Sequence, residues 1–298
     1  MNFSEFASKD KNNFFKAFYA RRTIRIFPLY YFYLILTFLI LPALAGQETA
    51  DFSTTWYWWA NLQNIAQTLN WSWDGPVFYW SLAVEEHFYL FWPLLVYYLP
   101  RKQVAIASFF LIALSFIVRI FMLNKGMEVF YFTLTRLDAL SLGALLAVFE
   151  PQLLRPSQKN RRLFLFSLFL VDIPLTLIFV LAAGRGSLWV LAVKYPMTAL
   201  VYTSLIGCSI TTKNDSILRK VFESQALRFV GSISFGLYVY HLLCYSWLDT
   251  LVPNSQPLLM MPLAFLFSGA VSYLSFLLLE KPFLKLRRFF PYQKKVTA

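Results

Sequence analysis

The sequence carries little charge for its length. Of its 298 residues, 14% are charged and 58% are hydrophobic, whereas soluble domains carry roughly 25% charged residues. Cysteine and histidine are scarce, with only Cys208, Cys244, His87 and His241 in the chain. Both cysteines fall in apolar segments, which favours small core residues over a disulfide or a metal site. The two histidines come from different segments without further ligands at suitable spacing, so we expect no bound metal.

Several motifs of soluble enzymes are missing as well. The chain has no Gly-rich phosphate loop, no nucleophile elbow and no zinc-protease motif. It also has no internal repeat and no nucleic-acid-binding motif. The net charge of +12 comes from short basic clusters between apolar runs, a distribution typical of membrane proteins. We therefore expect a lipid bilayer, and no nucleic acid, as a partner.

Long apolar runs are the main feature that is present. Several approach the ~20 residues with which a helix crosses a bilayer. They are continuous rather than alternating, which favours helices over a β-barrel. The sequence predicts an all-α, polytopic transmembrane helical bundle forming one membrane-embedded domain over residues 1–298. Residues 1–25 form a basic entry, 211–235 an amphipathic surface segment and 281–298 a basic tail. Eight spans are expected at about 26–45, 86–99, 104–123, 135–149, 163–183, 188–210, 236–252 and 258–279.

The basic residues predict the orientation of these spans. With the N-terminus inside, 22 of the 27 Lys and Arg residues fall in cytoplasmic segments, and only Lys125 and Arg185 fall outside. This asymmetry follows the positive-inside rule and predicts that both termini are cytoplasmic. The long loop over residues 47–80 has no Lys or Arg but holds six of the nine tryptophans. Their density favours an outer interfacial position, with sugar stacking as the alternative.

Ionisable residues within the predicted spans are candidates for function, because charge at membrane depth is costly. The orientation places these residues from four elements at a similar depth near the outer face: Glu85, Glu86, Arg119, Arg136, Asp138 and Lys194. The alternatives are an exposed helix cap for the adjacent glutamates and interfacial snorkelling for the long basic chains. We expect a shared polar cavity open to the outer side.

Two further features lie toward the cytoplasmic side. Arg22 and Arg25 are three positions apart, so a helix presents both guanidiniums on one face. Two such forks can bind phosphates bidentately, although plain positive-inside anchoring explains them equally. His241 lies a turn or two into the seventh predicted span. It is a candidate base, and its alternative is a hydrogen-bonded packing residue.

Four segments together resemble one family. Residues 18–31 (FYARRTIRIFPLYY) contain an Arg-x-x-Arg pair at the entry to a span. Residues 80–93 (WSLAVEEHFYLFWP) contain Ser81, Glu85 and Tyr89 in a Ser-x-x-x-Glu-x-x-x-Tyr pattern. Residues 135–143 (TRLDALSLG) contain an Arg-x-Asp-x-x-x-x-Gly pattern, and residues 234–241 (SFGLYVYH) precede Glu280-Lys281-Pro282 at the end of the last span. In this order and spacing, they resemble the acyltransferase-3 family of integral membrane O-acyltransferases over about residues 14–285.

One family feature is not found. Members usually begin with two further spans, the first with an Arg-x10-His motif whose histidine is the proposed base. Here neither His87 nor His241 has an arginine eleven residues before it. We expect a form shortened by the N-terminal two spans, a mis-assigned start, or half of a split protein whose partner is an N-terminal fragment.

The resemblance implies transfer of an acyl group, acetyl by default, from acetyl-CoA or another acyl-CoA co-substrate to a carbohydrate hydroxyl. It implies no bound cofactor and a multi-pass location in the bacterial inner membrane. Arg22 and Arg25 would hold the phosphates of the donor, and Ser81 and Tyr89 would also bind substrate. Glu85, Tyr89, Arg136 and Asp138 would line and order the transfer cavity. Glu85 or His241 would replace the missing base. The alternatives are a glycan or lipid-linked sugar flippase and a catalytically incomplete fragment.

Overall fold

The computed structural model describes residues 11–71, 75–153, 159–182, 188–212, 217–253 and 256–291. Throughout these ranges, every regular element is a helix, as the sequence predicts. Contacts between helices divide the chain into two compact units, one made mainly of residues 52–220 and the other of 8–51 with 221–298. We call them unit 1 and unit 2 and describe each by itself. Trp73, Asp74, Arg185 and the end of the basic tail lie outside the described residues.

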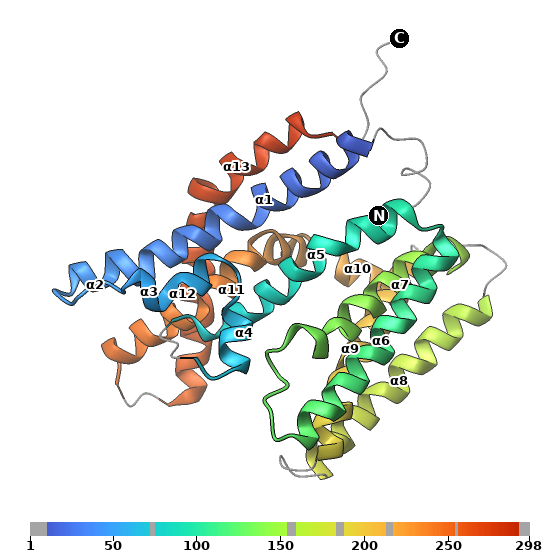
Figure 1. The fold of residues 1–298 in the computed structure, drawn as a ribbon. Coiled ribbons are helices and arrows are strands. Elements are labelled where there is room, and N and C mark those ends of the chain that lie inside the picture. The colour runs from blue at the N-terminus through green and yellow to red at the C-terminus, as the bar shows by residue number, and fades with distance from the viewer. Residues whose placement is uncertain are drawn as a thin grey trace. The chain divides into compact units, whose positions relative to one another are not determined.

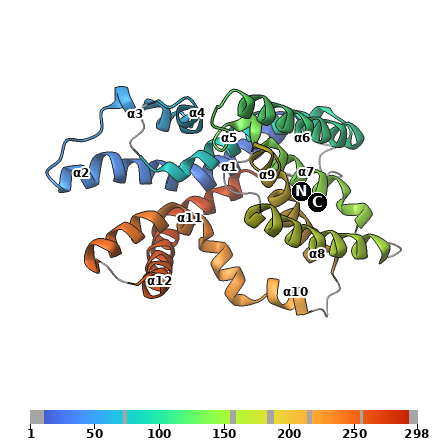
Figure 2. The ribbon, with the colours of Figure 1, turned by 90° about the horizontal axis from the view of Figure 1, so that it is seen from below.

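Seven α-helices lie entirely within the described part of unit 1, and Figure 1 shows them in colours from blue through green to yellow. They are α3 (Phe52–Trp59), α4 (Gln63–Thr68), α5 (Trp80–Tyr98), α6 (Arg101–Asn124), α7 (Leu137–Leu153), α8 (Lys159–Ala182) and α9 (Leu188–Thr211). Helices α6, α7, α8 and α9 lie side by side in both views (Figures 1 and 2). Aromatic and aliphatic residues of α5, α6 and α7 form a core that includes Phe88, Trp92 and Val104.

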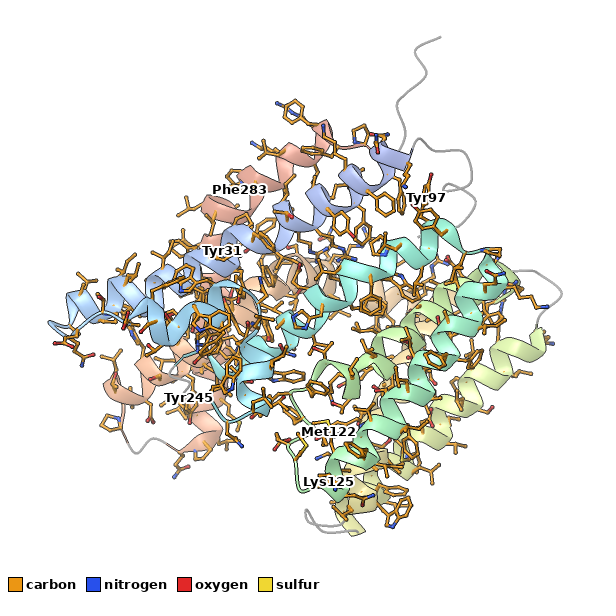
Figure 3. All side chains as sticks on the ribbon, in the orientation of Figure 1. Tyr31, Tyr97, Met122, Lys125, Tyr245 and Phe283 are labelled. Atoms are coloured by element: carbon orange, nitrogen blue, oxygen red, sulfur yellow. The ribbon has the colours of Figure 1, made fainter. Side chains whose placement is uncertain are left out.

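A loop over residues 125–136 joins α6 to α7 and shapes one end of unit 1. Figure 3 labels Met122 and Lys125 at this end of α6. Gly126 has φ of +68°, a left-handed conformation that ends helices readily because glycine has no Cβ. The loop closes with a single 3₁₀ turn, η4 (Thr133–Thr135), directly before α7. Its position brings loop side chains against α5 and α9.

Unit 2 joins the beginning of the described chain to its end. Helix α1 (Lys11–Ile35) continues through a π-helical turn, η2 (Leu36–Ile40), into α2 (Leu41–Leu44). It contacts α11 (Gln225–Leu251) and α13 (Lys281–Lys285), which follows α12 (Pro257–Ser275) and a second π-helical turn, η5 (Phe276–Glu280). Figure 3 labels Tyr31 and Phe283 on the adjacent α1 and α13. The short α10 (Ile217–Phe222) spans the boundary between the units.

Helices α11 and α12 approach each other closely at a glycine. A Cβ added to Gly236 would lie 3.0 Å from Cβ and 3.2 Å from Cα of Ser272. Small residues at such crossings allow helix backbones in a membrane to pack tightly. Gly231, also on α11, has nothing within 4 Å of an added Cβ. The two glycines therefore differ in what a side chain would meet.

Five helical stretches in the described chain are long and apolar enough to cross a membrane: Lys11–Leu44, Arg101–Asn124, Leu188–Thr211, Gln225–Leu251 and Pro257–Phe289. They correspond to five of the eight expected spans. The other three expected spans fall on α5, α7 and α8. Helix α7 has 17 residues, and α8 contains only a shorter apolar stretch, Leu165–Phe179. The chain is thus a multi-pass membrane protein.

One sequence-based helix boundary was wrong. The second span was expected to begin at Glu86, but α5 begins at Trp80, because no helix breaker separates Trp80 from the glutamates. Glu85 therefore lies in the second turn, which excludes an N-terminal cap. Within residues 211–235, for which the sequence predicts an amphipathic surface segment, α11 begins at Gln225. The Ser224 hydroxyl caps it by accepting from Leu227 N–H at 3.4 Å.

Candidate active site

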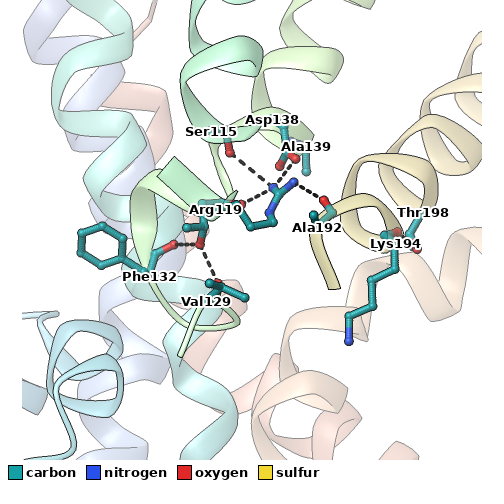
Figure 4. A network of polar contacts seen from close by, with 10 residues as sticks. Ser115, Arg119, Val129, Phe132, Asp138, Ala139, Ala192, Lys194 and Thr198 are labelled. Atoms are coloured by element: carbon teal, nitrogen blue, oxygen red, sulfur yellow. Dashed lines mark hydrogen bonds and ion pairs between the residues drawn. The ribbon is translucent and has the colours of Figure 1, made fainter. Parts of the chain in front are cut away.

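A buried ion pair joins α6 to α7. The Arg119 guanidinium forms a salt bridge with Asp138, and their side chains are 0% and 2% exposed. The same guanidinium donates to the carbonyl of Thr135, to that of Ala192 at 2.9 Å and to the Ser115 hydroxyl at 3.4 Å. Figure 4 shows these contacts converging from three helices. Arg119 is therefore a structural junction among α6, α7 and α9, and it does not snorkel to an interface.

Both carboxylate oxygens of Asp138 accept hydrogen bonds. Its Oδ2 accepts from Arg119, while its Oδ1 accepts the Ala139 N–H at 2.9 Å. The sequence pattern places Asp138 two residues after Arg136, yet the carboxylate bridges to Arg119 instead. Arg136 ends the 3₁₀ turn η4, whereas Asp138 lies in the first turn of α7.

Arg136 lies in a cage of aromatic rings. Its guanidinium carbon is 4.5 Å from the ring centroid of Tyr195, 5.1 Å from that of Trp80 and 5.3 Å from that of Phe130. The Trp80 and Phe130 rings also contact each other, with centroids 4.7 Å apart. Lys194 Nζ lies 4.7 Å from the Tyr195 ring. The cage therefore combines α5, the α6–α7 loop and α9 around one cation.

A second group of candidate residues lies on α5. Ser81, Glu85 and Tyr89 are four positions apart in turn, so a helix aligns them on one side. The Tyr89 hydroxyl donates to Glu85 Oε2 at 3.2 Å. All three side chains are half-buried. This hydrogen bond orients one oxygen of the Glu85 carboxylate.

A second polar chain connects α4, α5 and the loop. The Asn64 amide nitrogen donates to Thr133 Oγ1 at 2.8 Å and to the Tyr131 carbonyl at 3.2 Å. Thr133 Oγ1 is 2.7 Å from His87 Nδ1. The Thr133 hydroxyl can therefore donate a hydrogen bond to that nitrogen while it accepts one from Asn64. Burial raises the pKa of the Tyr131 hydroxyl in the loop above the ordinary tyrosine value.

Unit 2 contains the remaining sequence-predicted site residues. Arg22 and Arg25 lie on α1, whose helical geometry gives them a common face. Arg25 acts electrostatically on Glu280, a buried carboxylate at the end of the π-helical turn η5. His241 is exposed on α11, and its Nδ1 lies 2.7 Å from the Tyr238 carbonyl. Because a carbonyl only accepts, Nδ1 carries the proton and neutral His241 keeps its lone pair on Nε2.

The sequence predicts ionisable residues from four segments near the outer face. The structure brings residues of three of these segments together, because Arg119, Arg136 and Lys194 all lie around the Tyr195 ring. Sequence reasoning missed the roles of Tyr195, Phe130 and Thr133. Tyr195 follows Lys194 directly, and that adjacency was the available signal. Phe130 and Thr133 belong to an irregular loop, where no periodicity indicates which side chains face a site.

Several known proteins are similar in sequence to this chain. A family model described as an acyltransferase domain matches residues 6–280. An O-acetyltransferase OatA of Staphylococcus aureus is 25% identical over 90% of this chain and 47% of its own length. A peptidoglycan O-acetyltransferase OatA of Listeria monocytogenes is 26% identical over 76% of this chain and 39% of its own. The chain therefore spans less than half the length of these relatives. No solved structure matches the chain.

The match to the family model covers far more than half of the chain, and it includes each of the four motif segments up to Glu280. The ordered motifs and the all-helical membrane architecture agree with it. The chain belongs to the acyltransferase-3 family.

Proposed function

We propose that the chain is a membrane O-acyltransferase that moves an acetyl group from a cytoplasmic acyl-CoA to a hydroxyl of a cell-surface carbohydrate. The family match over residues 6–280 carries this proposal. The relatives' names, O-acetyltransferase and peptidoglycan O-acetyltransferase, support acetyl as the group and a peptidoglycan-type glycan as the acceptor. The acyl-CoA donor follows from the family resemblance.

We further propose eight spans, with α5, α7 and α8 crossing alongside the five long apolar stretches, in a bacterial inner membrane. The distribution of Lys and Arg supports cytoplasmic termini. In this orientation, Arg22 and Arg25 lie at the cytoplasmic face, where the phosphates of the donor arrive. Guanidinium forks suit phosphate recognition because they donate two parallel hydrogen bonds.

The chemistry requires a base. The acceptor hydroxyl oxygen attacks the thioester carbonyl, its proton passes to the base, and the CoA thiolate leaves. Two residues are candidates. Glu85 is oriented by the Tyr89 hydroxyl, and His241 presents Nε2 as an acceptor because Nδ1 is bound to the backbone. Asp138 acts as a positioning residue, because it holds Arg119 and with it the loop that carries Arg136.

The test uses membranes containing the chain, labelled acetyl-CoA and a panel of bacterial glycans. Glu85→Gln should lower kcat by about a hundredfold or more if Glu85 is the base. His241→Gln is compared in parallel, and loss in that variant alone would assign the base to His241. Glu150→Gln, a carboxylate near the end of α7, is the matched control and should retain transfer.

Donor binding is tested separately. Arg25→Ala should raise KM for acetyl-CoA by about tenfold, with a smaller effect on kcat. Lys102→Ala removes an exposed charge at the start of α6 and should leave KM unchanged. The assay is repeated with a co-expressed segment carrying an Arg-x10-His span. Transfer seen only with that segment would assign the base to it, and no transfer under either condition would refute the proposed function.

A further inference from the structure

The starting observation is the charge balance around Tyr195. Three cations surround its ring: the guanidinium carbons of Arg136 and Arg119 are 4.5 Å and 5.5 Å from the centroid, and Lys194 Nζ is 4.7 Å away. One buried carboxylate, Asp138, lies among them, and it forms its salt bridge with Arg119. Asp138 also acts electrostatically on Arg136, but its salt bridge is with Arg119, so within the described residues no ion pair occupies the Arg136 guanidinium.

The contacts of the Arg136 guanidinium are of one kind. Within the described ranges it meets three aromatic faces and makes no hydrogen bond and no ion pair. Ring faces attract the π-face of a guanidinium, but they do not accept its N–H groups. Its five donors lie in the guanidinium plane and stay charged at every physiological pH. The cage thus holds the cation and leaves its hydrogen-bonding edge to a ligand.

The side chains next to the cage favour a negatively charged ligand. Lys194 extends away from the Arg119 junction, as Figure 4 shows, and approaches the same Tyr195 ring as Arg136 does. The acidic group that acts on Lys194 is Glu128, an exposed loop residue whose Oε1 accepts the Phe130 N–H at 2.7 Å. Lys194 thus has one exposed carboxylate near it, and that carboxylate is already bonded to the backbone.

We infer that the edge of the Arg136 guanidinium, with Lys194 beside it, binds an oxyanion on the carbohydrate acceptor. This inference rests on the proposed function and adds to it that the acceptor is acidic. A planar fork pairs best with a planar carboxylate, in two parallel N–H···O bonds. The aromatic rings contribute by fixing the fork before the ligand arrives, which lowers the entropy lost on binding.

The test measures binding, so that it does not depend on turnover. The purified full chain is placed in phosphatidylcholine nanodiscs, which carry no net lipid charge. The probes are peptidoglycan glycan strands freed of their peptides, with their carboxylates either free or converted to neutral methylamides. The free-acid strand should bind the wild-type chain about tenfold more tightly than the amidated strand.

Three variants locate this preference. Arg136→Gln should bind both strands equally, at the affinity of the wild type for the amidated strand. Arg136→Lys keeps the charge without the planar fork and should retain only part of the preference. Lys125→Gln removes an exposed cation at the end of α6 and should keep the full preference. Thermal unfolding of each variant shows whether a lost preference reflects a lost fold.

Several results would overturn the inference. Equal binding of both strands by the wild type would do so, as would no binding of either. An acid preference that persists in Arg136→Gln would place the anion elsewhere. Phosphatidylglycerol nanodiscs distinguish a lipid phosphate from the glycan: if this lipid abolishes glycan binding by competing at Arg136, the site belongs to the lipid. Acid-selective binding without acetyl transfer would support the inference and count against the enzymatic proposal alone.

Discussion

Breaking the junction between Arg119 and Asp138 should destabilise unit 1 strongly. Asp138→Asn leaves a guanidinium with 0% exposure and no negative partner in its salt bridge. Removing one partner of a buried pair costs about 3–5 kcal/mol, because the remaining charge stays desolvated. The hydrogen bonds of Arg119 to the carbonyls of Thr135 and Ala192 persist in this variant and offset only part of the loss.

The double variant Arg119→Met with Asp138→Asn removes both charges together. Its cost should come mainly from the two carbonyls left without a donor, at about 1–3 kcal/mol each. Arg119→Met alone has this cost and also leaves the buried carboxylate unpaired. The two single variants should therefore add up to a loss several kcal/mol greater than that of the double variant.

The assay is equilibrium unfolding in mixed micelles, in which a denaturing detergent is titrated and helix content is followed by circular dichroism. Ser115→Ala is the control within the same network. It removes only the 3.4 Å contact to Arg119 and should cost under about 1 kcal/mol. The reasoning would be refuted if the losses of unfolding free energy in the two single variants sum to the loss in the double variant within about 0.5 kcal/mol. Independent sites are additive to this accuracy.

Three smaller predictions follow from other contacts. Gly236→Leu should destabilise unit 2 by about 1–3 kcal/mol through overpacking. Gly231→Leu is the control, because Gly231 has open space around it, and it should not destabilise the unit. Equal unfolding midpoints for the two variants would contradict the prediction. Thr133→Val should lower the free energy of unfolding by about 1–3 kcal/mol, because it leaves Asn64 and His87 without their Thr133 partner. Thr198→Val loses one exposed hydrogen bond within its own helix and should change the same free energy by no more than about 0.5 kcal/mol. Tyr89→Phe should lower kcat less than loss of the carboxylate one turn before it, and a larger effect would make the phenol itself a reacting group.

Much of the fold could be predicted from hydropathy and charge. Continuous apolar runs identified the long helices, because a helix in lipid must satisfy its backbone internally and bury few charges. Boundaries failed where the signal is weak. The charge at Glu86 predicts a helix that starts there, at the membrane surface. In the structure, the preceding residues from Trp80 onward are helical as well.

The candidate site was predicted less completely. The sequence identified Arg136 and Asp138 as a motif, yet the carboxylate pairs with Arg119, nineteen residues earlier. Adjacency in sequence does not specify which of two cations a carboxylate meets across helices. The cage around Arg136 depends equally on a loop, and only tertiary packing brings Phe130 and Tyr195 together. The assignment of one membrane domain and the roles of Glu85, Ser81 and His241 stay predictions.

The arrangement of unit 2 has a consequence for biosynthesis. Its first segment ends at Asp51 and its second begins at Val221, and the contact between Arg21 and the Phe290 carbonyl joins residues 269 positions apart. Helix α1 therefore leaves the ribosome long before α11 and α13, which it packs against. Unit 2 therefore cannot complete its packing until the last helices of the chain have been made, and its assembly depends on contacts of high sequence separation.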